Sequence, residues 1–267
     1  MPGQRIVTLT TDFGLVETYA GVIKGVICSI NPSVQLVDIT HAVQSFDILD
    51  GALAISQAYS YFPPDTVHLV VVDPGVGSSR RPIVVRAGQH IFVAPDNGVL
   101  SLVYEREEAL AVHHITSEHY FHQPVSNTFH GRDIFAPVAG YLSKGVELLK
   151  FGDQVTDFVR FVAPKPKPTS PNSWKGVVLK TEKFGNLITN ITPKDIPQLF
   201  QASPPTFRIN VGKAEVTKIC PNYAAGAQGE IFALLGSAGF LEISMNRGSA
   251  ARTASADRGA EVLVTLA

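Results

Sequence analysis

The segment 71-VVDPGVGSSRRPIVV-85 indicates how the first part of the chain folds. An apolar run leads into Asp73, a Pro-Gly-Val-Gly turn follows, and a second apolar run begins after Arg80 and Arg81. Such runs favour buried strands, and glycine and proline favour a tight turn between them. We expect this turn to bring Arg80 back toward Asp73, either as a structural ion pair or as part of a functional site.

Strands and helices alternate on both sides of this segment. The expected strands are residues 6–10, 34–39, 66–72, 83–86 and 91–94, and the expected helices are residues 17–30, 48–61 and 134–142. The apolar residues of 17–30 recur at helical spacing, whereas the strands are short and β-branched. The alternation predicts a layered α/β domain over residues 1–163.

The composition changes at 164-PKPKPTSPNS-173, which predicts an extended, semi-rigid linker. Beyond it, residues 174–267 contain only short apolar runs separated by turn signals. The expected strands are residues 176–180, 187–191, 206–211, 215–219, 230–235, 240–245 and 261–266. This pattern predicts a smaller, all-β, barrel-like C-terminal domain.

Charge and composition restrict the partners. The 22 Lys+Arg and 23 Asp+Glu residues nearly cancel, so we expect no nucleic-acid partner and a small neutral or zwitterionic ligand. No apolar run approaches the length of a membrane helix and no leader-like segment is evident, so a cytoplasmic protein without a membrane partner is expected. Cys28 and Cys220 lie far apart and are expected to be reduced core residues.

Two further positions are candidates for chemistry. Asp12 follows the first expected strand, where open α/β sheets bind ligands, and its carboxylate suits either the vicinal hydroxyls of a ribose or the N-cap of the next helix. His130, within 128-TFHGRDIF-135, precedes a glycine at a loop-to-helix junction. If Asp73, Arg80 and His130 converge at strand ends, they can hold and polarise a water molecule.

A metal site is not expected. His113, His114, His119 and His122 lack the tight Cys/His spacing of a structural zinc site. The sequence therefore predicts no metal and no organic cofactor.

Five motifs occur in a fixed order along nearly the whole chain. They are 10-TTDFG-14, 73-DPGVGSSRR-81, 128-TFHGRD-133, 184-FGNLITNI-191 and 246-NRGSAA-251. In these motifs the chain resembles the S-adenosylmethionine hydroxide adenosyltransferases, the hydrolase relatives of the fluorinases and chlorinases. The resemblance implies an α/β domain followed by a β-barrel domain, and hydrolysis of S-adenosyl-L-methionine to adenosine and L-methionine by in-line attack of water on the ribose C5′.

The resemblance also implies roles for individual residues. Asp73, Arg80 and His130 fall on the triad that positions the attacking water, and Asp12 falls on the carboxylate that binds the ribose diol. The implied nucleoside contacts in the second domain are Phe184, Asn186, Tyr223, Met245, Asn246 and Arg247, and those to the methionine end are Ser237 and Glu182. The family assembles as homotrimers with active sites between subunits, and the same is expected here.

Two other functions stay open at this point. A halide adenosyltransferase binds a small anion in a dry pocket, which a carboxylate at Asp73 would repel. A non-catalytic nucleoside-binding protein would be expected to keep Asp12 and Asn186 and to lose the triad. The chain has all three triad residues, which favours hydrolysis.

Overall fold

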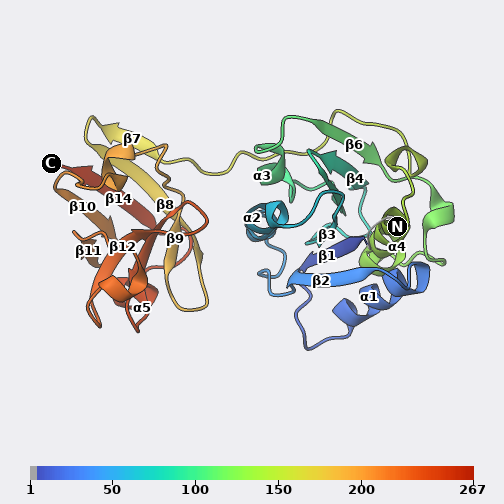
Figure 1. Cartoon of the computed structure of the whole chain (residues 1–267), viewed down its shortest axis with the longest axis horizontal. Coiled ribbons are helices and arrows are strands. Elements are labelled where there is room, and N and C mark those ends of the chain that lie inside the picture. Colours follow the sequence, from blue (N-terminus) through green and yellow to red (C-terminus); the bar gives the residue numbers. More distant parts are fainter. Residues whose placement is uncertain (1–4) are drawn as a thin grey trace. The chain divides into compact units, whose positions relative to one another are not determined.

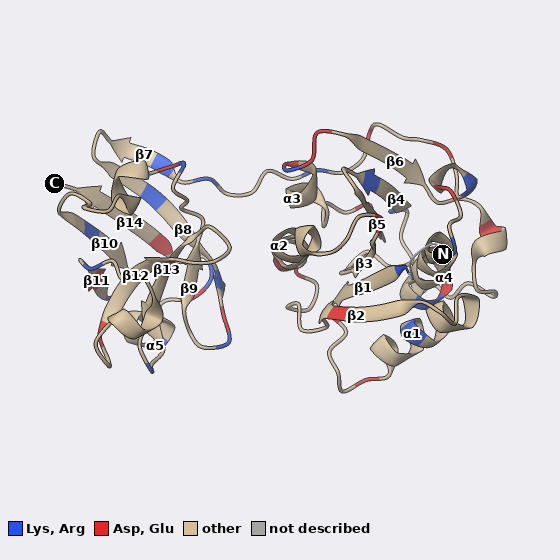
Figure 2. Ribbon diagram, in the orientation of Figure 1, with Lys and Arg blue, Asp and Glu red and all other residues tan. Residues whose placement is uncertain are grey.

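The computed structural model describes residues 5–267 (Figure 1). The chain divides into two compact units, one ending at Ala163 and the other beginning at Pro164. Among the described residues, no helix is long and apolar enough to cross a membrane. Residues of both charge signs are interspersed along the ribbon of each unit (Figure 2).

The first unit is built on a six-stranded mixed sheet in the order β2-β1-β3-β5-β4-β6. The strands are β1 (Ile6–Thr11), β2 (Gln35–Thr40), β3 (Val67–Val71), β4 (Pro82–Ala87), β5 (His90–Pro95) and β6 (Leu110–His114). The pairs β1–β2, β1–β3 and β3–β5 are parallel, whereas β4 is antiparallel to both β5 and β6. The carboxyl ends of β1 and β3 therefore meet at one edge of the sheet.

Helices cover both faces of this sheet. They are α1 (Tyr19–Ile30), α2 (Ile48–Ala58), α3 (Ser101–Tyr104) and α4 (Ala136–Ser143), with a π-helical turn at Gly131–Phe135 and short 3-10 turns at Tyr59–Tyr61, Glu118–Tyr120 and Leu148–Lys150. On one face Leu69 packs with α1 and α4, and on the other Val70 packs with α2 and α3. Burial on both faces explains why β3 is apolar except for His68.

The second unit is an eight-stranded, nearly closed antiparallel sheet in the order β11-β10-β14-β8-β9-β13-β12, with β7 paired to β8. The strands are β7 (Lys167–Ser170), β8 (Ser173–Thr181), β9 (Leu187–Thr189), β10 (Phe207–Val211), β11 (Ala214–Val216), β12 (Ile231–Leu235), β13 (Leu241–Met245) and β14 (Glu261–Leu266). An isolated bridge between Ile219 and Ala233 brings the two ends of the sheet together. The unit also contains the short helix α5 (Ala250–Ala254), begun by the Ser249 side chain, and 3-10 turns at Pro197–Phe200 and Tyr223–Ala225.

These architectures confirm the predicted fold class, with several differences in detail. The elements β6, α3 and α5 were not predicted, and β11 ends at Val216 rather than at residue 219. Within the proline-rich segment 164–173, β7 pairs with β8 instead of running free, and Pro168 is tolerated because β7 is an edge strand. Cys28 was expected in the core but is exposed, whereas Cys220 is buried.

Candidate active site

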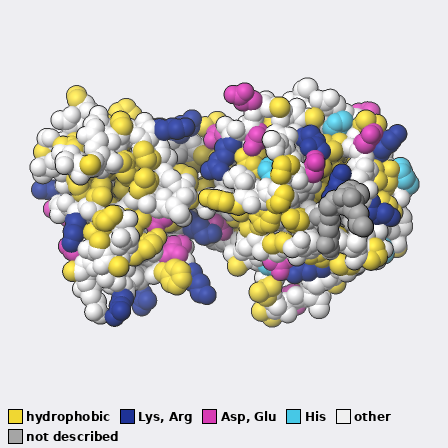
Figure 3. All heavy atoms as spheres, in the orientation of Figure 1, with side chains coloured by type: hydrophobic (Ala, Val, Ile, Leu, Met, Phe, Trp, Pro, Cys, Tyr) yellow, Lys and Arg dark blue, Asp and Glu magenta, His cyan; other side chains and the backbone are white. Residues whose placement is uncertain are grey.

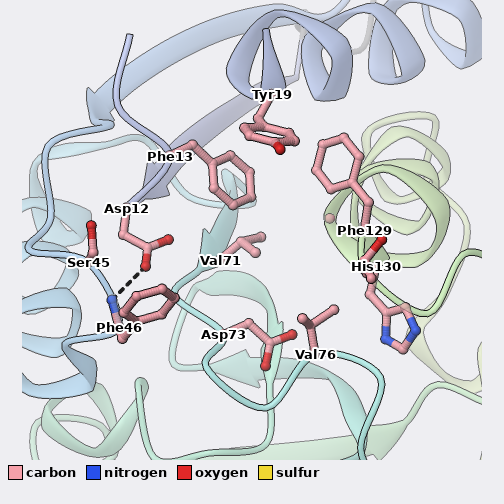
Figure 4. Close-up of a pocket in the computed structure, with 12 residues that line it drawn as sticks. Asp12, Phe13, Tyr19, Ser45, Phe46, Val71, Asp73, Val76, Phe129 and His130 are labelled. Carbon is pink, nitrogen blue, oxygen red and sulfur yellow. Dashed lines mark hydrogen bonds between the residues drawn. The ribbon is translucent and has the colours of Figure 1, made fainter. Parts of the chain in front are cut away.

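A cavity of about 250 Å³ lies at the carboxyl ends of β1 and β3 (Figure 4). Thr11 and Val71 are register partners in this parallel pair, so Asp12, one residue beyond Thr11, and Asp73, two residues beyond Val71, reach the same cavity. His130 lines it from the loop before the π-helical turn. The rest of the wall is largely apolar and includes the rings of Phe13, Tyr19, Phe46 and Phe129.

Asp73, Arg80 and His130 form one hydrogen-bonded cluster. The Arg80 Nε lies 3.0 Å from both carboxylate oxygens of Asp73, and its Nη2 donates both to Asp73 Oδ2 and to His130 Nδ1, at 2.7 Å from the latter. The two charged side chains are only 8% and 6% exposed. The guanidinium also packs 5.1 Å from the centre of the Phe135 ring. The structure thus brings together the three residues that the sequence predicted.

The glycine turn is fitted to the loop that carries His130. Gly77 has a φ of +77°, and a Cβ at this position would overlap the carbonyl oxygen of Asn127. Any other residue would therefore combine a left-handed backbone with a steric clash. The turn needs glycine because it packs directly on the histidine loop.

Asp133 anchors the loop that carries His130. This carboxylate is fully buried, accepts a hydrogen bond from the backbone N–H of Ser126 and pairs with Arg132, whose guanidinium lies over the Phe129 ring. Sequence reasoning did not assign Asp133 a role. Its signal in the sequence is a charged residue directly before the largely apolar segment 134–142.

Burial, followed by the positive charge of Arg80, lowers the pKa of His130 below its ordinary value. The imidazole is therefore neutral near pH 7. Because a guanidinium can only donate, His130 Nδ1 accepts the bond from Arg80, and the ring proton resides on Nε2.

Asp12 is not a helix cap. Its Oδ2 accepts a hydrogen bond from the backbone N–H of Phe46 at 2.8 Å, whereas Thr18 occupies the N-cap of α1 without a side-chain cap. Figure 4 shows the Asp12 carboxylate at the cavity wall beside the Phe46 ring. Phe46 has a left-handed φ of +66°, an uncommon conformation for a bulky residue, and was not predicted as a site residue.

The second unit contains its own cavity of about 500 Å³. Its lining residues are Glu182, Phe184, Asn186, Tyr223, Met245, Asn246, Arg247 and Gly248. The Asn186 amide donates to Glu182 Oε1 at 2.7 Å, which orients both groups. The residues predicted for this unit therefore converge, with one exception. Ser237 is exposed in the turn between β12 and β13 and is not among the residues that line the cavity.

A buried carboxylate beside this cavity was missed. Glu242 lies on β13, is 7% exposed, and its Oε2 accepts a hydrogen bond from the Tyr223 hydroxyl at 2.8 Å. Burial raises the pKa of Glu242, and the charge of Glu182 acts in the same direction. An acidic residue inside the apolar run 240–245 was the available signal.

Comparison with known proteins defines the class. Residues 7–152 match the family model for the SAM hydroxide adenosyltransferase N-terminal domain, and residues 176–263 match that for the C-terminal domain. The chain therefore belongs to the SAM hydroxide adenosyltransferase family.

Individual relatives match nearly the whole chain. It is 33% identical over 265 residues to an (R)-S-adenosyl-L-methionine hydrolase of Salinispora tropica, covering 97% of each chain. A protein of the same name from Methanocaldococcus jannaschii is 33% identical over 262 residues, covering 94% of this chain and 92% of that one. A fluorinase of Actinoplanes is more distant, at 26% identity over 294 residues with 99% of each chain covered. An uncharacterised conserved protein of Thermotoga maritima has a similar crystal structure, with a TM-score of 0.90, 38% identity and coverage of 97% and 99%.

Proposed function

We propose that this protein is an enzyme that hydrolyses S-adenosyl-L-methionine to adenosine and L-methionine. The observation that carries the proposal is the Asp73–Arg80–His130 cluster, of which Asp73 and His130 line the same cavity as Asp12. The full-length relatives named (R)-S-adenosyl-L-methionine hydrolase support it. Their names make the (R) form the first substrate to test.

The chemistry needs little from the protein beyond orientation and charge. A water oxygen forms a bond to the ribose C5′ while the C5′–sulfur bond breaks and its electron pair moves to sulfur. Methionine then leaves as a neutral thioether, so no acid is required to protonate it. The protein has to hold one water in line and accept its proton.

The tautomer of His130 decides which residue orients the water and which accepts its proton. With Nδ1 occupied by Arg80, the Nε2–H donates to the water and fixes its position. Asp73 is the acceptor in the cluster and takes the proton, while Arg80 keeps its carboxylate oriented. The proton leaves to solvent with the products.

The other proposed substrate contacts are assigned to residues that line the two cavities. Asp12 binds the ribose diol, and Phe184, Asn186, Tyr223, Met245, Asn246 and Arg247 form the nucleoside contacts of the second unit. Glu182 lines the same cavity and is therefore the better candidate for the methionine end. Ser237 is the weaker one, because it does not line that cavity.

Halide transfer is less well supported. Asp73 is nearly buried, and its negative charge would repel a halide in a site of low dielectric. A non-catalytic nucleoside-binding role does not explain why three polar groups are held together beside the cavity.

We further propose a homotrimer with active sites completed between subunits. Each cavity is bordered by aromatic side chains that its own unit does not cover: Phe46 is 71% exposed in the first unit, and Phe184 is 75% and Tyr223 48% exposed in the second. Hydrophobic side chains also gather at the surface of both units in Figure 3. A second copy of the chain that covers these rings would desolvate the reaction.

We propose that the reaction needs neither metal nor cofactor and takes place in the cytoplasm. Within residues 5–267 no group of three or more His, Cys, Asp or Glu side chains is arranged to hold a metal ion. Activity is expected to survive EDTA, and restoration of a lost activity by a divalent ion would contradict this part of the proposal.

The proposal is tested by incubating the protein with each S-adenosylmethionine epimer in ¹⁸O-labelled water, with and without chloride. We expect adenosine labelled at its 5′ oxygen, together with methionine, independent of chloride. Formation of 5′-chloro-5′-deoxyadenosine would indicate a halogenase. Unchanged substrate that binds without turnover would indicate a non-catalytic protein.

A further inference from the structure

A series of contacts between polar side chains connects α1 with the end of β1, next to Asp12. His41, just after β2, is only 4% exposed. Its Nδ1 lies 2.8 Å from Thr11 Oγ1, and its Nε2 lies 3.0 Å from Asp38 Oδ1. The second contact is close but too poorly aligned for a hydrogen bond, so it is chiefly electrostatic. Asp38 Oδ2 in turn accepts from Lys24 Nζ at 2.6 Å.

Donors and acceptors can be assigned consistently along these contacts. Thr11 Oγ1 accepts the backbone N–H of Phe13 at 3.3 Å, and its hydroxyl can donate to His41 Nδ1 when the imidazole proton is on Nε2, the tautomer that the Asp38 carboxylate favours. In this tautomer the imidazole proton is on Nε2, the ring nitrogen that lies 3.0 Å from Asp38 Oδ1. In each of the three contacts a donor group therefore lies next to an acceptor: the Thr11 hydroxyl next to His41, His41 next to Asp38, and Lys24 next to Asp38.

The series of contacts reaches the backbone on both sides of Asp12. Thr11 and Phe13 are its sequence neighbours, and the backbone N–H of Gly14 donates to the carbonyl of His41 at 2.7 Å. None of Lys24, Asp38, His41 and Thr11 is among the residues that line the cavity. Their contacts reach the cavity only through the backbone that aims the Asp12 carboxylate.

A second Thr–His pair in the same sheet provides a comparison. Thr8 Oγ1 lies 2.7 Å from His68 Nδ1, with both residues fully buried. Thr8 lies on the same strand as Thr11, but neither it nor His68 lines the cavity. The same bond thus occurs once beside the Asp12 turn and once away from it.

We propose that Lys24, Asp38, His41 and Thr11 form a positioning relay that fixes the Asp12 turn for binding of the ribose diol. The inference rests on the proposed function for the ribose role of Asp12. The four residues are positioning residues and do not touch the reacting atoms. Their loss is expected to weaken substrate and nucleoside binding while the Asp73–Arg80–His130 cluster continues to work.

The test compares two isosteric substitutions, Thr11→Val and Thr8→Val. Each removes one buried hydroxyl bonded to a histidine, so both are expected to lower stability to a similar extent. Only Thr11→Val is expected to raise KM and to weaken calorimetric adenosine binding, by about 5- to 30-fold, with kcat within about 3-fold of the parent. Thr11→Ser keeps the hydroxyl and should restore the parental KM.

A double-mutant cycle then connects the relay to its target. If the relay acts through Asp12, Thr11→Val should cause little further loss of adenosine affinity in an Asp12→Ala background. Amide hydrogen exchange of Phe13 and Gly14 should be faster in Thr11→Val than in Thr8→Val. Unchanged KM and affinity in Thr11→Val, or a full additional loss in the Asp12→Ala background, would overturn the relay.

The same measurements separate this inference from the proposed function. A parental protein that binds adenosine but does not hydrolyse S-adenosylmethionine contradicts the hydrolase proposal, while the affinities and amide exchange still judge the relay. A parental protein that binds no adenosine contradicts both.

Discussion

Arg80 Nη2 lies 2.7 Å from His130 Nδ1, a contact that fixes the protonation of the imidazole. Since arginine has no acceptor, the contact requires an unprotonated Nδ1. A histidine in this state is a hydrogen-bond donor through Nε2. In the proposed mechanism, Asp73 is therefore the proton acceptor of the cluster.

Asp73 and Asp12 are expected to separate in kinetics. Asp73→Asn should keep adenosine affinity and lower kcat by a factor on the order of 10²–10⁴, because it removes the proton acceptor. Asp12→Ala should weaken adenosine binding by roughly 1–3 kcal/mol, because a ribose hydroxyl pair loses its partner. Single-turnover kinetics and calorimetry measure the two effects. Parental turnover in Asp73→Asn would remove Asp73 from the mechanism.

The adjacent arginines provide a matched pair. Arg80 serves the cluster, whereas Arg81 Nε lies 3.0 Å from Asp96 and its Nη1 lies 2.8 Å from Asp157. Arg80→Lys should lower kcat about 10²- to 10³-fold, because an ammonium cannot reproduce the fork that joins Asp73 to His130.

Arg81→Lys is the control for this prediction. It should lower stability by about 1 kcal/mol and leave kcat near the parental value. Urea unfolding and initial rates measure both properties. The assignment of Arg80 is wrong if the two variants lose activity equally.

The depressed pKa of His130 predicts the acid limb of the activity profile. Burial and Arg80 move this pKa below the ordinary 6.5, so the neutral imidazole is present at pH 6.5 and is lost only as the pH falls further. The kcat should therefore hold down to below pH 6.5. In Arg80→Met the His130 pKa should rise, because a neighbouring positive charge is removed.

Titration of the His130 Cε1–H resonance by NMR measures this shift directly. A His130 pKa at or above 6.5 in the parental protein would contradict the neutral, Nε2-protonated state.

Buried His68 predicts a loss of stability in acid. Burial, followed by the charge of His90, lowers the pKa of His68 from 6.5 to about 3. Between these values the unfolded chain binds a proton that the folded protein does not, so stability falls by about 1.4 kcal/mol per pH unit as the pH decreases below 6.5.

Urea unfolding at several pH values tests this dependence. His68→Gln should flatten the slope, and His119→Gln, at an exposed position, should leave it unchanged. An unaltered slope in His68→Gln would mean that other groups cause the acid sensitivity.

Subunit complementation tests the proposed interfacial sites. Asp73→Asn is expected to disable the first unit, and Asn186→Ala is expected to disable the second. If each site combines units from two subunits, co-expression of the variants in equal amounts should restore about a quarter of the parental activity. No recovery in verified mixed trimers would show that each chain builds its own site.

The sequence determined the strand pattern and the chemical groups of the site. The largely apolar segment 66–72, in which Thr66 and His68 are the polar residues, is typical of a strand buried on both faces, and the sequence alone indicates this. The glycine turn and its spacing likewise indicated that Arg80 returns to Asp73, because a short turn limits what lies within reach. These are local properties of the chain.

Tertiary structure decided how those groups are partnered. The register of Thr11 with Val71 places Asp12 and Asp73 in one cavity, and the pairing of Asp12 with Phe46 excludes the helix cap. The edge position of β7 and the exposure of Ser237 depend in the same way on which strands become neighbours. Contacts between residues far apart in sequence follow from packing of the whole sheet, and no local pattern encodes them.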